Sequence, residues 1–79
     1  MSIETKLARA MSELDERGVL VLRDFELGTT RIARAEGGWW SITTEYEDGV
    51  YRTRLVSRRD ELEDEIRSWL KCQEQLDSF

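Results

Sequence analysis

Carboxylates are the chemically capable side chains that gather in this chain. Five of them fall within residues 60–65, namely Asp60, Glu61, Glu63, Asp64 and Glu65, and three more lie at Glu45, Glu47 and Asp48. Paired carboxylates perform acid–base catalysis when burial or a neighbouring charge shifts one pKa. Glu45 and Glu47 are two residues apart in a predicted strand, so they share an exposed face with nothing apolar beside them. We therefore expect no catalytic residue among them.

The chain has no histidine and a single cysteine, Cys72. The sequence therefore lacks the cysteine and histidine ligands of a zinc site. Without histidine, the serine–histidine and cysteine–histidine nucleophile arrangements are also excluded. No activating base is predicted beside Cys72, so it is expected to be an unreactive side chain. We expect a protein that is not an enzyme and that uses no metal or cofactor.

The acidic run at 60–65 has two interpretations. Acids in the first turn of a helix are stabilised by the macrodipole, and Glu63 can reach Arg67 four residues later. Alternatively, spaced carboxylates turned outward resemble a phosphate backbone and fit a groove lined by Arg and Lys, with Glu45, Glu47 and Asp48 extending that surface. A net charge of −5 disfavours direct nucleic-acid binding and favours a basic partner.

The elements that position these residues can be predicted from periodicity. Apolar residues at helical spacing predict a helix over 3–17, with Ser2 as N-cap and Gly18 after its end. Alternation and β-prone residues predict strands over 19–27, 30–36, 39–46 and 50–56, and a capping-box pattern from Ser57 to Asp60 opens a final helix. The short connections predict one α+β domain over 1–79, of order α-β-β-β-β-α, with a four-stranded antiparallel meander and both helices packed on one face.

Neighbouring strand residues point to opposite faces, so Trp39 and Trp40 must separate. The alternation predicts Trp40, Ile42, Tyr51 and Leu55 beneath the helices. It places Trp39 on the open face near Arg52 and Arg54, either as a partner contact or stacked on an arginine. The first strand is apolar on both sides, which indicates either burial within a curved sheet or a patch for dimerisation.

As a very small acidic α+β chain with an acid-rich helix and no catalytic motif, the sequence resembles phage-encoded anti-CRISPR proteins. The resemblance is of general character. It implies a non-enzymatic inhibitor whose acidic face blocks a nucleic-acid-binding surface of a CRISPR effector. The alternatives are a homodimeric structural or regulatory interaction module that uses the open sheet face, and an immunity or antitoxin protein that neutralises a nuclease.

The expected partner is the basic surface of a larger protein or ribonucleoprotein complex, and the chain is expected to be a monomer or a homodimer. The longest apolar run, from Val19 to Leu22, is far shorter than the ~20 residues of a membrane span, and the N-terminus lacks a signal-peptide apolar segment. We expect a cytoplasmic protein that does not contact a membrane.

Overall fold

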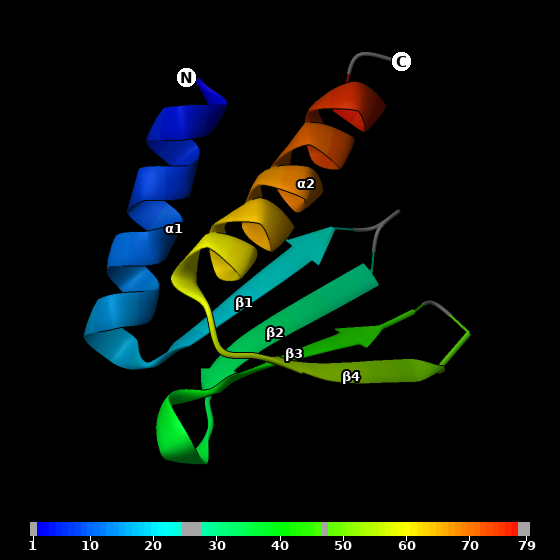
Figure 1. Cartoon of the computed structure of the whole chain (residues 1–79). Coiled ribbons are helices and arrows are strands. Elements are labelled where there is room, and N and C mark those ends of the chain that lie inside the picture. The colour runs from blue at the N-terminus through cyan, green and yellow to red at the C-terminus, as the bar shows by residue number, and fades with distance from the viewer. Residues whose placement is uncertain (1, 25–27, 47, 78–79) are drawn as a thin grey trace.

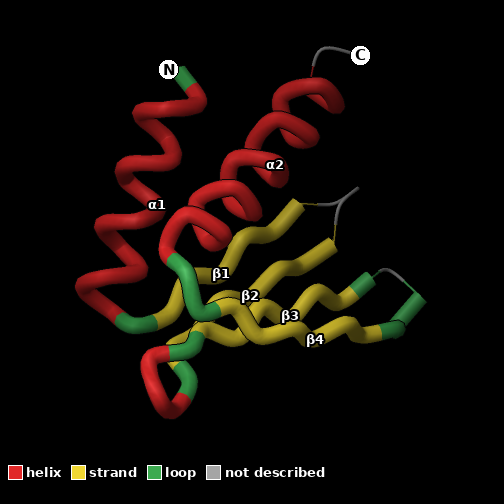
Figure 2. Tube along the Cα trace, in the orientation of Figure 1, coloured by secondary structure: helices red, strands yellow, loops and turns green. Residues whose placement is uncertain are grey.

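Two helices lie on the same side of a four-stranded antiparallel sheet in the computed structural model of the chain (Figure 1). The structure describes residues 2–24, 28–46 and 48–77. The elements are α1 (Ile3–Arg17), β1 (Val19–Asp24), β2 (Gly28–Arg34), the short 3-10 turn η1 (Glu36–Gly38), β3 (Trp40–Glu45), β4 (Tyr51–Val56) and α2 (Arg59–Asp77). The strands neighbour one another in chain order, which confirms the predicted meander (Figure 2).

The ends of α1 are those predicted. The Ser2 side chain accepts a hydrogen bond from the Thr5 amide at 3.2 Å, and Gly18 adopts a φ of 75° while its amide donates to the Leu14 carbonyl at 2.8 Å. These bonds satisfy backbone groups that a helix end leaves unpaired. The helix therefore stops where the chain must turn into β1.

The links around β2 differ from the prediction. Gly28 and Thr29, which separate two predicted strands, begin β2, and Gly37 and Gly38, which separate the next two, form the end of η1. Gly28 has a φ of 82°, and a Cβ there would overlap the carbonyl oxygen of Glu45. The position therefore requires glycine because of close backbone approach as well as its φ.

The core fills the space between the helices and the sheet. Its buried side chains come from both helices and all four strands: Leu7, Met11, Leu14, Leu20, Ile32, Ile42, Val56, Leu62, Ile66 and Leu70. Trp40 is half-buried against this cluster, whereas Trp39 is 44% exposed. The expected separation of the two tryptophans is thus observed.

The predicted orientation of β4 is wrong. Val56 is paired with Trp40 and is 3% exposed, while Arg54 pairs with Ile42 and Arg52 with Thr44, so these residues face the helices. Tyr51 and Leu55 face the open side and are 65% and 57% exposed. The helices cover β4 only near Val56, so the two arginines reach water on the helix side.

Neither helix, over the residues described, has an apolar stretch that could cross a bilayer.

The helix α2 begins at Arg59. Asp60 there accepts a hydrogen bond from the Glu61 amide at 3.1 Å.

Candidate functional site

The acidic run at the start of α2 is largely paired with arginines. Asp60 lies 2.7 Å from Arg58, Glu63 lies 3.9 Å from Arg59, Asp64 lies 2.9 Å from Arg67, and Glu65 pairs with Arg54. Among the described residues, Glu61 alone of the five carboxylates has no ion pair. The cluster therefore presents far less unbalanced negative charge than its sequence suggested.

Two of these arginines also join α2 to α1. Arg59 donates two hydrogen bonds to Asp15, at 2.8 and 2.6 Å, and Arg67 donates one to Glu4 at 3.1 Å. The hydrogen bond from Arg59 lowers the pKa of Asp15, and the same bond raises the pKa of Arg59. The charges on this side of α2 thus serve helix–helix packing.

The Asp15–Arg59 pair gives a pH prediction. Because the pKa of Asp15 is lowered by folding, its ionised form stabilises the protein above the unfolded-state pKa of about 4, and this stabilisation disappears as pH falls through the lower folded-state value. We expect Asp15→Asn to lower the free energy of unfolding at neutral pH, and the difference from wild type to vanish in acid. Denaturant unfolding at a series of pH values measures this difference. Glu16→Gln is the matched control, and a difference for Asp15→Asn that stays constant with pH would contradict the assignment.

The hairpin acids do not extend the α2 surface. Glu45 pairs with Tyr51 and lies on the open side of the sheet, opposite to α2. The Asp48 side chain accepts a hydrogen bond from the Val50 amide at 3.1 Å, within the hairpin turn. Glu47 lies outside the described residues. The two acidic segments, expected to form one face, are therefore separated by the sheet.

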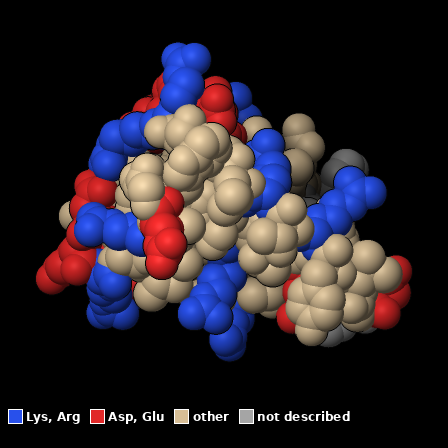
Figure 3. Space-filling view, turned by 60° about the horizontal axis from the view of Figure 1, so that its bottom comes forward, with Lys and Arg blue, Asp and Glu red and all other residues tan. Residues whose placement is uncertain are grey.

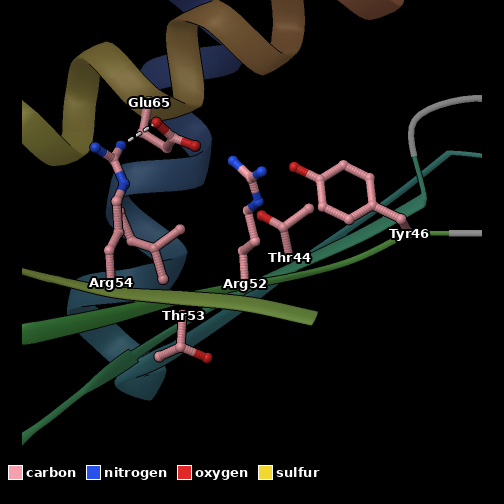
Figure 4. A pocket seen from close by; sticks show the side chains of 7 residues that line it. Thr44, Tyr46, Arg52, Thr53, Arg54 and Glu65 are labelled. Carbon is pink, nitrogen blue, oxygen red and sulfur yellow. Dashed lines mark hydrogen bonds and ion pairs between the residues drawn. The ribbon is translucent and has the colours of Figure 1, made fainter. Parts of the chain in front are cut away.

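A groove of about 490 Å³ lies between α2 and the helix-facing side of β3 and β4. It is lined by Ile42, Thr44, Tyr46, Arg52, Thr53, Arg54 and Glu65. Figure 4 shows Arg52 and Arg54 rising from β4 toward α2, while Thr53 points to the other side of the strand. The guanidinium of Arg54 pairs with Glu65, and the side chain of Arg52 lines the groove together with those of Thr44 and Tyr46, whose hydroxyl points toward it (Figure 4).

The opposite side of the sheet is uncovered by helices and is called here the open face. It consists of three cross-strand rows: Val19, Ala33, Ser41 and Leu55; Val21, Arg31, Thr43 and Thr53; Arg23, Thr29, Glu45 and Tyr51. Trp39 has an extended backbone next to Trp40, which packs on the core, so by alternation Trp39 lies on the open face beyond the first row. Thr43 and Thr53 share a hydrogen bond at 3.2 Å across this face. Figure 3 views the molecule from this side and shows uncharged side chains interspersed with charged ones.

The structure separates the site residues that the sequence had grouped. Trp39 lies on the open face, whereas Arg52 and Arg54 line the groove on the helix side, so the expected Trp39–arginine contact is wrong. The arginine that does stack on a tryptophan is Arg34, 5.3 Å from the Trp40 ring. Sequence reasoning missed Thr44 and Tyr46 in the groove, although their alternation with Ile42 predicts a shared face.

No three of the Asp, Glu and Cys side chains within the described residues gather so as to hold a metal ion. Cys72 is a free, exposed thiol on α2. Comparison with protein-family models, with curated proteins and with solved structures found no match for this chain.

Proposed function

We propose that the chain is a non-catalytic interaction protein that assembles with a second copy of itself through the open face. One observation carries the proposal. Of the six large hydrophobic side chains that are exposed among the described residues, four lie on this face: Val21, Trp39, Tyr51 and Leu55. Large apolar side chains that are exposed together on one face of a protein are a feature of interaction surfaces.

The rows of the open face are complementary to themselves. A two-fold axis parallel to the strands, between β2 and β3, sets β1 of one protomer opposite β4 of the other. It brings Val19 opposite Leu55 and the guanidinium of Arg23 over the ring of Tyr51, because each pair occupies one row. Every such contact occurs twice in the dimer.

The charges on the face fit the same arrangement. Arg31 of one protomer falls opposite Thr43 of the other, one row from Glu45, the acid of the open face. Arg31 and Glu45 have no ion pair with any described residue of their own chain. An intermolecular pair between them joins two opposite charges across the interface.

The size of the face supports a weak, reversible dimer. Four strands of six residues span roughly 19 by 20 Å, or about 400 Å² of flat surface per protomer before side-chain relief is counted. The total for two protomers, about 800 Å², is below the roughly 1,200–2,000 Å² of stable specific interfaces and falls among weak, transient ones. We therefore expect association in the micromolar range.

Sedimentation velocity over a micromolar concentration series tests the proposal. We expect the sedimentation coefficient to rise with concentration for wild type, and Trp39→Ala to weaken association about tenfold, because aromatic anchors dominate interfaces. Tyr46→Ala is the matched control, since Tyr46 is 43% exposed but lies on the helix side. A strict monomer at high micromolar concentration would exclude the dimer.

A second candidate function is inhibition of a basic nucleic-acid-binding surface, in the manner of an anti-CRISPR or immunity protein. The net charge of −5 supports it. The arginine pairs of α2 weaken it, because a carboxylate already paired gains less from a basic partner. In this case the purified chain alone would be a monomer and would associate only with its target.

A further inference from the structure

The groove between α2 and β4 holds an unbalanced positive charge. Arg52 and Arg54 are two residues apart on one side of β4, and Glu65 is the acid that lines the groove with them. Glu65 pairs with Arg54 and leaves Arg52 without an ion pair to any described residue. The lining therefore carries one net positive charge.

Two hydroxyl groups line the groove together with Arg52. The Tyr46 hydroxyl points toward Arg52 from the end of β3, and Thr44 supplies the second hydroxyl (Figure 4). Thr44 also shares a hydrogen bond of 3.4 Å with the buried Thr30, which fixes the position of its hydroxyl group. A hydroxyl oxygen can accept from one neighbour and donate to another, so Thr44 remains able to bind an anion.

We propose that this groove binds a small-molecule oxyanion, either a carboxylate or a phosphate monoester. The Arg52 guanidinium makes the charged contact, and the Tyr46 and Thr44 hydroxyls donate to the remaining oxygens. The exposed ring of Tyr46 and the floor at Ile42 supply an apolar wall for the rest of the ligand. A volume of about 490 Å³ lies within the range of small-molecule sites.

The groove and the open face lie on opposite sides of the sheet. Ligand binding and dimerisation therefore use different residues, with Arg52 serving the groove and Leu55 the open face. A mutation that abolishes ligand binding therefore leaves dimerisation measurable, and one that abolishes dimerisation leaves ligand binding measurable.

Phenyl phosphate and benzoate are the probes, titrated into the folded full chain and followed by amide NMR shifts and calorimetry. We expect saturable shifts centred on residues 44, 46 and 52–54, and no binding of uncharged benzyl alcohol. Arg52→Gln should weaken the affinity about tenfold or more, because it removes a charge-assisted hydrogen bond. Arg9→Gln is the matched control: it removes one exposed arginine from α1 and should leave the affinity unchanged.

Glu65→Gln gives a change of opposite sign. It frees Arg54 for the ligand and removes the groove's negative charge, so the affinity should rise about threefold. Tighter binding of phenyl phosphate would identify a phosphate monoester, and tighter binding of benzoate would identify a carboxylate. Absence of saturable binding by both probes, or equal losses for Arg52→Gln and Arg9→Gln, would overturn the proposal.

Discussion

Replacing Val56 by aspartate is expected to unfold the protein, whereas Leu55→Asp is expected to leave it folded. Val56 is 3% exposed and packs within the core, while its neighbour Leu55 is 57% exposed on the open face. An unpaired carboxylate buried at Val56 costs several kcal/mol, and a chain of this size has a total stability of only about 4–12 kcal/mol.

Circular dichroism and denaturant unfolding of the two variants measure this contrast. The two variants carry the same substitution at adjacent residues, so a difference in their stability shows which of the two side chains is buried. If Leu55→Asp unfolded the chain and Val56→Asp did not, β4 would face the opposite way. The residues assigned to the open face and to the groove would then be wrong, because both assignments depend on that orientation.

The same Leu55→Asp variant is expected to abolish dimerisation while preserving the fold. In the two-fold arrangement Leu55 packs opposite Val19, so the substitution places two carboxylates in apolar contacts of one interface. We expect the dissociation constant to rise about 100-fold, measured by sedimentation over the concentration range in which wild type associates.

Val50→Asp is the matched control for this experiment. Val50 is 52% exposed, and its carbonyl accepts a hydrogen bond from the Tyr46 amide in the hairpin. Val50 is therefore paired with Tyr46, which lies on the helix side, and is outside the open face. It should therefore dimerise as wild type does. Wild-type association of a folded Leu55→Asp variant would contradict the proposed interface.

Local signals in the sequence were sufficient to predict the helices and the strand order. Ser2 and Gly18 carry the chemistry of a helix start and a helix end, and both perform those roles. Alternating and β-prone residues predicted four strands with short links, from which the meander follows. Boundaries shifted by one or two residues where Gly28 and Thr29 joined β2.

The orientation of β4 could not be predicted because it depends on coverage by the helices. Tyr51 and Leu55 alternate with Arg52 and Arg54, which are charged, so alternation alone assigned Tyr51 and Leu55 to the core. The structure buries Val56 instead, since α2 passes over that end of the strand only. The tertiary packing of the helices decides which positions of an edge strand are covered. The sequence pattern of the strand alone does not contain this information.

The ion-pair partners of the acidic run at 60–65 also could not be predicted from the local sequence. The predicted Glu63–Arg67 pair joins residues four apart, yet Arg67 instead pairs with Asp64 and with Glu4, which is 63 positions away. Arg54 reaches Glu65 from β4 across the groove. Pairing over such separations appears only once the helices and sheet are assembled.

The meander also bears on how the chain reaches its native state. Because every described strand pairs with a chain neighbour, the sheet grows by successive hairpins that close short loops and lose little chain entropy at each step. The docking of α2 on α1 joins the two ends of the sequence and has the largest loop to close. Assembly that proceeds from nearby to distant contacts in this way favours rapid folding, with the helix pair completing the core last.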